Sequence, residues 1–367
     1  MTLSRRALLH RLLAAGLSLP TVALLLDACS PRAALVDDPD AELGPIESTL
    51  NIYNWSDYVA AETLEGFERE FGVRISYDTY ESNEEMIAKM VAGGDGYDLI
   101  VPTSYLWPAL RDLGLIQRLK RRYLTGLGNI AREFAATAND PTGELAVPYA
   151  WGMTGIAYRS DKVQAPPDSW GVFHDTALRG RMTMMDEARE VFGAFLRYRG
   201  HSLNSTDPAL LAAAKADTLL AKPNLKAFLS GTVKAQLVAG DVHLAQTWNG
   251  EALQARAEQE RNGEGTIEFV LPKEGALIWL DGMAVPARAR HPRAAHEFIN
   301  YCLRPEVAAQ NAAAHQYGVP NGAAQRLITH PVPWPSAEEL TRLEYFKDLG
   351  REMLAWDRAW TEVKAAG

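Results

Sequence analysis

The hydrophobic pattern from Thr49 onward alternates between strand-like and helix-like segments. Short apolar runs rich in β-branched and aromatic residues predict strands, and longer stretches with apolar residues three and four apart predict amphipathic helices. The first set reads strand, helix, strand, helix, strand, helix, over residues 49–55, 60–72, 73–79, 82–94, 97–103 and 105–115.

A second set of the same kind follows further along the chain. Its strands are predicted at 181–185, 242–248 and 276–286, and its helices at 187–200, 210–222, 251–263, 292–303 and 305–315. Strands that alternate with helices of this length predict an α/β fold of mostly parallel sheets flanked by helices. No fixed period relates the two sets, so a chain of 367 residues is expected to form two domains rather than a repeat array.

The first residues predict export from the cytoplasm. Residues 1–28 begin with Arg5, Arg6 and Arg11 and continue as an apolar run that Pro20 interrupts. The run is too short to span a bilayer, and a basic start before a short apolar centre is typical of a signal peptide. The segment SRRALLH resembles a twin-arginine export signal.

The segment LDACS resembles the lipoprotein cleavage box and makes Cys29 the candidate lipidated residue. Asp27 is an unusual charge inside such a box, and the alternative is that Cys29 is only a small residue near a cleavage site. Residues 29–48 are rich in Pro and Asp and are interpreted as a tether. We therefore expect a periplasmic, lipid-anchored protein.

Composition excludes several function classes. The chain is 47% hydrophobic and 23% charged, as in ordinary soluble globular proteins. Its 37 Lys and Arg against 46 Asp and Glu give a net charge of -9, which becomes -11 once residues 1–28, with three Arg and one Asp, are removed. Such a chain lacks the basic excess that nucleic-acid binding requires, so no nucleic-acid partner is expected. With only Cys29 and Cys302, it has no disulfide framework, and Cys302 is expected to be a buried free thiol.

Common catalytic and cofactor motifs are missing from the sequence. It has no GxSxG, HExxH, GxxxxGK[ST] or strand-to-helix GxGxxG motif, and its eight His are scattered. We expect no metal, no cofactor and no enzymatic activity.

Acidic and aromatic residues follow the predicted strands. Ligands of open α/β sheets bind beyond the carboxyl ends of the strands. A site lined by acidic and aromatic side chains suits a ligand with cationic ends and an apolar middle. A carboxylate 4 Å from an ammonium contributes about 4 kcal/mol at an effective dielectric of 20, and an aromatic face contributes about 0.5–2 kcal/mol. The residues at or near these strand ends are Trp55, Ser56, Asp57, Tyr58, Ser104, Tyr105, Asp186, Glu187, Glu190, Trp248, Glu251, Trp279 and Asp281.

Each of these residues also has a purely structural interpretation. Glu187 and Glu190 fit acids in the first turn of a helix, where they complement its dipole. Trp248 and Trp279 fit an ordinary core. Asp281, two residues beyond Trp279 on one face of a strand, is harder to explain in this way, since a buried acid needs a partner.

Several long segments resemble the polyamine-binding family of bacterial periplasmic solute-binding proteins, which serve spermidine and putrescine ABC transporters. They are IYNWSDYV, YDLIVPTSY, VPYAWGMTGIAY, MDEAREVF, TWNGEA, LPKEGALIWLDGMAVP, NYCLRPEVA and QYGVPN. The resemblance implies the type II periplasmic-binding-protein fold, with the ligand in the cleft between two lobes. Lobe 1 would comprise residues 49–152 and 282–325, and lobe 2 residues 153–281 and 326–367.

The resemblance also implies a function and a site. The protein would capture putrescine or spermidine outside the cytoplasm as a monomer, deliver it to an inner-membrane ABC permease, and catalyse no reaction. By motif, the ligand-binding residues would be Trp55, Ser56, Tyr58, Tyr105, Glu187, Glu190, Trp248, Trp279, Asp281 and Tyr317, with Ser230 at a further position that family members use.

Three departures from the family pattern leave the length of the ligand open. Glu187 stands where relatives commonly have Asp, Glu251 follows the putrescine-type pattern, and Phe346 falls near a position where the spermidine type has Gln. Five candidate acids outnumber the charges of putrescine or spermidine, namely Asp57, Glu187, Glu190, Glu251 and Asp281. We therefore expect Asp57 or Glu187 to be satisfied by other partners.

Different functions could use the same residues. A receptor for an amino acid would need a cationic clamp for the ligand carboxylate, and Arg189 is the basic residue within a site motif. The same residue types would also serve a receptor for another cationic amine, a ligand sensor, or a secreted hydrolase with Glu190 and Asp281 as its two carboxylates.

Overall fold

The structure is a computed structural model that describes residues 38–93, 96–262, 266–329, 332 and 334–366. The predicted signal peptide and Cys29 lie outside the described residues, as does the tether as far as residue 37. Within the described residues, no helix combines the length and the apolar character needed to cross a bilayer.

The chain divides into two compact units. Unit 1 contains the chain up to Trp151 and Leu280–Val332, and unit 2 contains Gly152–Trp279 and the chain from Pro333 on. The sequence placed the chain crossings after residues 152 and 281 and the final one after 325. The observed crossings follow Trp151, Trp279 and Val332, so they differ by one, two and seven residues, and as a consequence Asp281 lies in unit 1.

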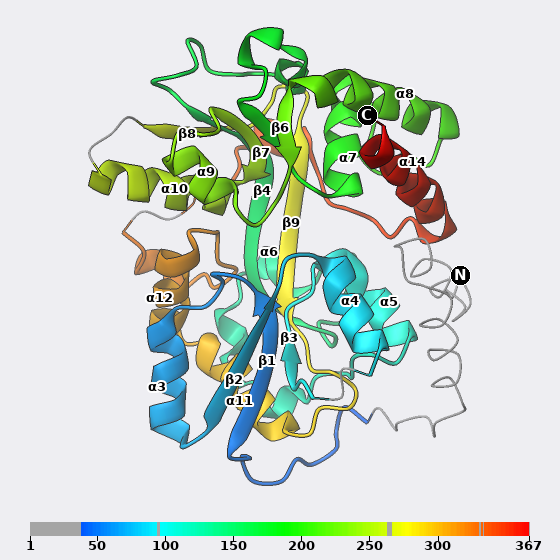
Figure 1. Ribbon diagram of the computed structural model, residues 1–367. Helices are drawn as coiled ribbons and strands as arrows, with labels where there is room; N and C mark the ends of the chain where they lie inside the picture. The colour runs from blue at the N-terminus through cyan, green and yellow to red at the C-terminus, as the bar shows by residue number, and fades with distance from the viewer. Residues whose placement is uncertain (1–37, 94–95, 263–265, 330–331, 333, 367) are drawn as a thin grey trace. The chain divides into compact units, whose positions relative to one another are not determined.

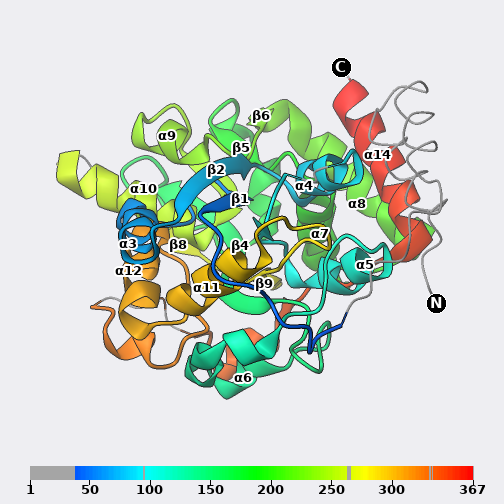
Figure 2. The same ribbon diagram turned by 90° about the horizontal axis from the view of Figure 1, so that it is seen from below.

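Unit 1 is built around a parallel sheet. Its described strands have the order β2-β1-β3, and β1 pairs in parallel with both neighbours. In Figures 1 and 2, α3 and α12 lie to one side of these strands and α4 and α5 to the other. The strands and helices are β1 Thr49–Trp55, α3 Ala61–Phe71, β2 Arg74–Tyr80, α4 Asn83–Val91, β3 Leu99–Ile100, α5 Trp107–Asp112, α6 Arg132–Ala135, α11 Pro292–Cys302 and α12 Pro305–His315.

Local sequence explains where these elements begin and end. α3 ends at Gly72, whose φ of 67° is left-handed, and its amide donates to the Glu68 carbonyl. α4 begins after Ser82, whose hydroxyl accepts from the Glu85 amide at 3.2 Å. The predicted parallel βαβαβα order is therefore confirmed, although β3 has only two residues. Short 3₁₀ helices in unit 1 occupy Ser104–Leu106, Arg121–Tyr123, Thr125–Asn129 and Ala324–Arg326.

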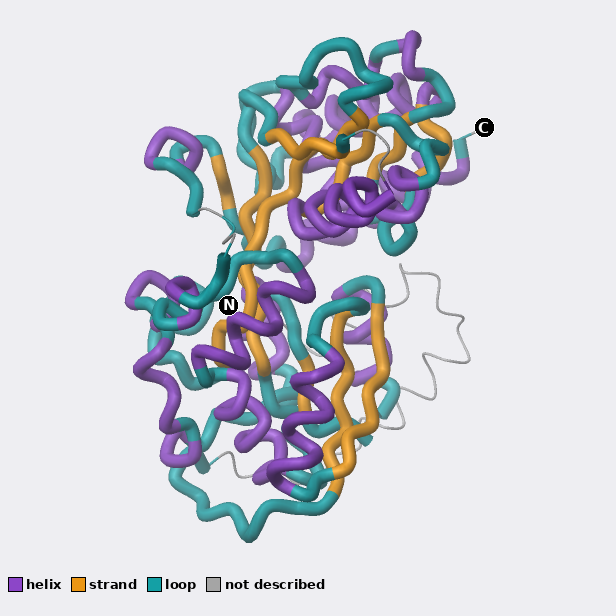
Figure 3. The backbone as a smooth tube through the Cα atoms, turned by 90° about the vertical axis from the view of Figure 1, so that its left-hand side faces the viewer, coloured by secondary structure: helices purple, strands orange, loops and turns teal. Residues whose placement is uncertain are grey.

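Unit 2 contains a second sheet with helices on both faces. Figure 3 shows the strands and the helices beside them as a tube. Its strands and helices are β5 Met182–Met184, α7 Ala188–Tyr198, α8 Pro208–Ala221, β6 Leu225–Phe228, α9 Val233–Val238, β7 Leu244–Trp248, α10 Asn249–Asn262, β8 Ile267–Val270, α13 Ala337–Leu340, β10 Leu343–Glu344 and α14 Met353–Ala365. Short 3₁₀ helices occupy Trp170–His174, Thr176–Leu178, Lys222–Asn224 and Gly350–Glu352.

Two long strands contribute residues to both units. β4 covers Val147–Arg159 and β9 covers Ala276–Met283. The sheet order is β10-β9-β4-β7-β5-β6, with β8 also paired to β4. β5 pairs in parallel with β6 and β7, whereas β4 is antiparallel to β7 and β8. The sequence pattern missed β4 because nearly all its residues are buried, so it shows no alternation of polar and apolar positions.

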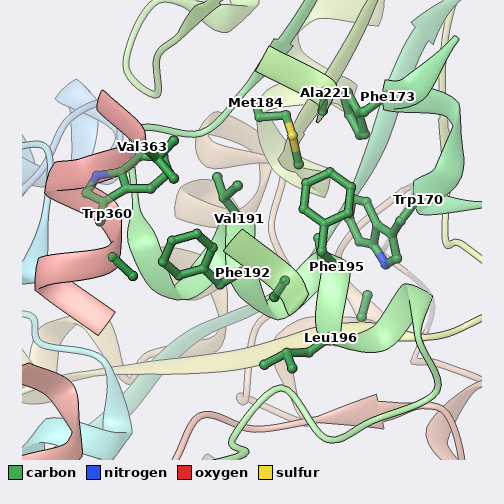
Figure 4. Packing of buried hydrophobic residues seen from close by; sticks show 14 of the residues in the cluster. Trp170, Phe173, Met184, Val191, Phe192, Phe195, Leu196, Ala221, Trp360 and Val363 are labelled. Carbon is green, nitrogen blue, oxygen red and sulfur yellow. The ribbon is translucent and has the colours of Figure 1, made fainter. Parts of the chain in front are cut away.

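The core of unit 2 lies between this sheet and the helices α7, α8 and α14. Phe192 on α7 packs edge to face against Trp360 on α14, with ring centroids 5.7 Å apart. Figure 4 shows this contact beside Val191, Phe195 and Met184. Alanines and valines of α9 and α10 cover the opposite face. These contacts hold α7 in place, and the N-terminal end of this helix carries Glu187, Arg189 and Glu190.

Candidate functional site

Asp281 is the central acidic residue of unit 1. It lies on β9 and is 4% exposed. The hydroxyl of Tyr58 donates to its Oδ2 at 2.7 Å. Oδ1 is also buried and forms no hydrogen bond of normal geometry with a described residue. The Tyr58 hydroxyl therefore helps to position the carboxylate, whose Oδ1 retains an acceptor for a further donor.

Burial dominates the electrostatics of this carboxyl group. Loss of solvation raises the pKa of Asp281 to about 7, although the hydroxyls of Thr103 and Tyr58 favour the charged form. The unliganded site is thus poorly compensated for a negative charge. A cation next to Oδ1 would supply the missing compensation.

Aromatic rings surround Tyr58. Its ring lies 5.5 Å from those of Tyr149 and His315 and 5.6 Å from that of Tyr317. Tyr149 also donates from its hydroxyl to the Tyr58 carbonyl at 2.6 Å. The sequence nominated Tyr58 and Tyr317 but missed Tyr149 and His315, since nothing in their local pattern separates them from core residues.

His315 is a neutral member of this cluster. Its Nδ1 accepts a hydrogen bond from the Tyr317 amide at 2.9 Å. Burial lowers the pKa of His315 to about 3, so the imidazole adds no positive charge beside Asp281. It fixes the Tyr317 backbone directly after the left-handed residue Gln316.

The other nominated residues of unit 1 lie directly after β1 or after β3, and they differ in burial. Trp55 ends β1, and its indole donates to the Val101 carbonyl at 2.9 Å. Ser56 is exposed and donates to Glu81, and Asp57 is exposed with a left-handed φ of 53°. Ser104 is buried and Tyr105 half-buried in the 3₁₀ helix that follows β3. Asp57 therefore does not share the burial of Asp281.

Glu190 is the central acidic residue of unit 2. It lies in the first turn of α7, is 5% exposed, and accepts from the Thr154 hydroxyl at 3.1 Å. Its backbone carbonyl accepts from the side-chain Nε2 of Gln246 at 3.0 Å. Burial raises the pKa of Glu190 to about 7, against the lowering effects of Thr154, Trp248 and Arg189. Unit 2 thus also holds a buried carboxylate whose negative charge is only partly compensated.

Two of the nominated tryptophans lie in unit 2, the unit that contains Glu190. Trp248 ends β7 and pairs in register with Thr154 of β4, the residue that donates to Glu190. Trp279 on β9 is 7% exposed and lies against Gly152, where a Cβ atom would collide with its indole. Glycine is required at position 152 for this close approach.

The remaining nominated residues of unit 2 lie near the starts of α7, α9 and α10. Glu187 is the half-buried N-cap of α7, and Glu251 is half-buried in the first turn of α10. The Ser230 hydroxyl accepts from the Asp186 amide at 3.2 Å. Asp186 itself is exposed and pairs with Lys364 at 3.0 Å.

Arg189 points to structural partners. It donates to the Lys347 carbonyl at 3.2 Å and to Asn204 Oδ1 at 2.9 Å. Its guanidinium stacks on Phe346, 4.2 Å from the ring centroid. These contacts occupy both terminal nitrogens and one face, which argues against its use as a clamp for a ligand carboxylate.

The described residues contain no group of three or more His, Cys, Asp or Glu side chains arranged to hold a metal ion. Among the buried carboxylates of the described residues, Asp281 in unit 1 and Glu190 in unit 2 lie beside hydroxyl donors and aromatic rings. This chemistry suits binding of ammonium groups joined by methylenes.

Comparisons with known proteins agree with this chemistry. The family model described as bacterial extracellular solute-binding protein matches residues 62–341. The spermidine/putrescine-binding periplasmic protein of Escherichia coli is 36% identical over 87% of this chain and 92% of its own length. The putrescine/cadaverine-binding protein of Pseudomonas aeruginosa is 35% identical over 86% and 93%.

Solved structures that resemble this chain include proteins of the same kind. A putative spermidine/putrescine ABC transporter protein from Listeria monocytogenes superposes with a TM-score of 0.81 and 32% identity, covering 87% of this chain and 99% of the other. The TpPotD lipoprotein of Treponema pallidum gives 0.77 and 29%, covering 86% and 99%. The predicted type II periplasmic-binding-protein fold and the predicted family are confirmed. The chain belongs to the bacterial extracellular solute-binding proteins.

Proposed function

We propose that this protein binds a polyamine, putrescine or spermidine, outside the cytoplasm and delivers it to an inner-membrane ABC permease. The observation that carries the proposal is the pair of buried carboxylates, Asp281 in unit 1 and Glu190 in unit 2. An ammonium group beside either carboxylate would compensate its charge, and the methylenes attached to that ammonium would lie on aromatic faces at about 0.8 kcal/mol per buried CH₂. The names of the relatives support this ligand class.

The wider set of nominated residues belongs to the same proposal. Asp281, Tyr58 and Tyr317 would recognise one ammonium, and Glu190, Trp248 and Trp279 another. Lesser contacts are proposed for Trp55, Ser56, Asp57, Ser104, Tyr105, Glu187, Ser230 and Glu251.

Titration calorimetry of the purified mature protein with putrescine, cadaverine, spermidine and spermine tests the ligand. We expect saturable binding of at least one amine in the micromolar range or tighter. No heat with any of the four at millimolar concentration would refute the proposal. Native mass spectrometry of the same sample would weigh a co-purified amine and would test the expected monomer.

We also propose lipid anchoring through Cys29. The lipoprotein relative from Treponema pallidum supports this proposal. Membrane fractionation of the native protein and of Cys29→Ala provides the test, because the substitution should release the protein into the soluble periplasmic fraction. Equal membrane association of both proteins would exclude Cys29 as the anchor.

A binding role without catalysis follows from the same site chemistry. The alternative is a two-carboxylate hydrolase with Glu190 and Asp281, for which the sequence offers no sugar-binding pattern beyond aromatic residues. Turnover of any member of a glycoside panel, lost in Glu190→Gln, would support that alternative instead.

A further inference from the structure

The N-terminal end of α7 is attached to the C-terminal segment of unit 2. Arg189 donates to the Lys347 carbonyl, and Asn204 accepts from both Arg189 and the Lys347 amide, the latter at 2.8 Å. The amide of Asn204 donates in turn to the Tyr345 carbonyl at 2.9 Å. Residues 345–347 are therefore held against the helix turn that carries Glu190.

Two aromatic rings also pack against the Arg189 guanidinium. Its Cζ lies 4.2 Å from the Phe346 centroid and 5.2 Å from that of Trp356. Arg189 is 6% exposed and Phe346 8% exposed, so the charge is screened little by water. Its hydrogen bonds and ring contacts direct it toward the C-terminal segment.

Glu190 follows Arg189 directly and is equally buried. The two side chains line one small cavity, whose other walls include Thr154, Gln246 and Phe346. Glu190 accepts from Thr154, whereas Arg189 donates to Asn204 and the Lys347 carbonyl and stacks on Phe346. Arg189 and Glu190 are thus consecutive buried residues that line one cavity, and each has hydrogen-bond partners of its own.

We propose that Arg189 is a positioning residue for amine binding: held by Asn204, Phe346 and Lys347, its buried charge favours the ionised form of the Glu190 carboxylate, the form that a ligand ammonium binds. This inference rests on the proposed function. It also assigns a role to the C-terminal segment, which holds the guanidinium by stacking and hydrogen bonds and leaves Glu190 itself for the amine. Phe346, which departs from the family pattern, becomes part of this support.

Other charged groups near the start of α7 need separate treatment. Arg197 lines the same cavity two turns further along α7, but it pairs with Glu344 at 2.6 Å and donates to the Glu274 and Arg342 carbonyls. It is therefore a matched control arginine. Near the start of α7 the charged groups also include Glu187, Glu251, Lys347 and Asp186, the last of which pairs with Lys364. On the helices that pack against α7, Asp217 pairs with Arg199 and Lys215 pairs with Glu362, whereas Asp357 and Arg358 lie on α14.

The test follows putrescine affinity from pH 5.5 to pH 8.5 in the mature protein. Arg189→Gln should move the acidic loss of binding upward by about half to one pH unit, so that Kd rises about two- to five-fold at pH 7 and returns to within about two-fold of wild type at pH 8.5. Arg189→Lys, which keeps the charge, should restore the wild-type profile. Arg197→Gln should leave the profile unchanged.

A second variant guards against misfolding of Arg189→Gln. Phe346→Ala keeps every charge but opens the guanidinium to water, so it should move the profile in the same direction by a smaller amount. An unchanged profile in both variants, or an equal shift in Arg197→Gln, would overturn the proposal.

A readout without ligand separates this inference from the proposed function. The side-chain carboxyl ¹³C resonance of Glu190 should titrate at higher pH in Arg189→Gln than in wild type. That shift would support the role of Arg189 even if no amine bound. An unchanged Glu190 titration would refute that role even if putrescine bound tightly.

Discussion

Tyr58 and Asp281 lie 223 residues apart in the chain, yet the hydroxyl of one donates to the carboxylate of the other at 2.7 Å. The bond joins the loop after β1 to β9 inside unit 1. It leaves Oδ1 of Asp281 buried without a normal hydrogen bond to a described residue. The Tyr58 hydroxyl thus helps to orient a carboxylate whose Oδ1 is available to a ligand.

Removing that donor should weaken amine binding. Tyr58→Phe deletes a hydrogen bond to a charged group and should raise the putrescine Kd about ten-fold at pH 7.5, since such bonds contribute about 1.5–3 kcal/mol and part is recovered from water. Tyr80→Phe is the control, because the Tyr80 hydroxyl is also buried but donates to the Val101 carbonyl. Equal Kd values for Tyr58→Phe and wild type would contradict the assigned role.

Asp281→Asn should weaken binding and stabilise the unliganded protein. The substitution removes the partner charge of an ammonium and should cost more than about 1 kcal/mol of binding free energy. The folded-state pKa of about 7 exceeds the ordinary 3.8, so the native protein holds more protons between these values and loses stability as pH rises through that window. The Asn variant should escape this loss.

Urea denaturation measures the second effect. At pH 8 the unliganded Asp281→Asn protein should exceed wild type in free energy of unfolding by on the order of 2 kcal/mol, and at pH 4 the two should agree. A variant less stable than wild type at pH 8 would show that the carboxylate is compensated within the protein.

Amine affinity should decline as pH falls below about 7. Ordinary carboxyl pKa values would place the loss of amine affinity near pH 4–5. Burial, however, raises the pKa of both Asp281 and Glu190 to about 7. The ligand binds the ionised forms, so below pH 7 binding must release protons, with a loss of up to about ten-fold per pH unit for each carboxylate. Calorimetry at pH 6 in two buffers of different ionisation enthalpy should detect this release. Affinity that stays flat down to pH 5 would contradict it.

Ornithine should bind far more weakly than putrescine, although it differs only by an added carboxylate. Arg189, the basic residue in a site motif, is engaged by Asn204 and the Lys347 carbonyl, and a ligand carboxylate near Asp281 or Glu190 would be repelled. We expect a difference of about 100-fold or more in Kd by competition against putrescine, with cadaverine as the diamine control that lacks a carboxylate. Similar affinities for ornithine and putrescine would favour the amino-acid receptor.

Gly152→Ala should impair binding through Trp279. A Cβ at position 152 would collide with the Trp279 indole and with Asn249 Oδ1, so the indole must move. We expect a rise of several-fold or more in the Kd for putrescine and an altered tryptophan emission spectrum. Gly44→Ala is the matched control, since nothing lies within 4 Å of its added Cβ. An unchanged Kd and spectrum for Gly152→Ala would show that the position of the Trp279 indole is not critical.

Local sequence was enough to predict the strand and helix order of unit 1 and the chemistry at its strand ends. β1 covers the predicted residues 49–55, and α3 ends where Gly72 predicts. These features depend on contacts between residues a few positions apart, which the periodicity and the cap residues record directly. The long motifs added the family, because they occur in order over most of the chain.

Tertiary structure decided which of the nominated residues act together and in what state of charge. It paired Asp281 with Tyr58, placed His315 and Tyr149 beside them, turned Arg189 toward the C-terminal segment, and left Asp57 exposed. Burial and the resulting pKa values depend on groups that arrive from distant parts of the chain. No local pattern records those groups, so the sequence could nominate acids for the site but could not distinguish the buried Asp281 and Glu190 from an exposed neighbour.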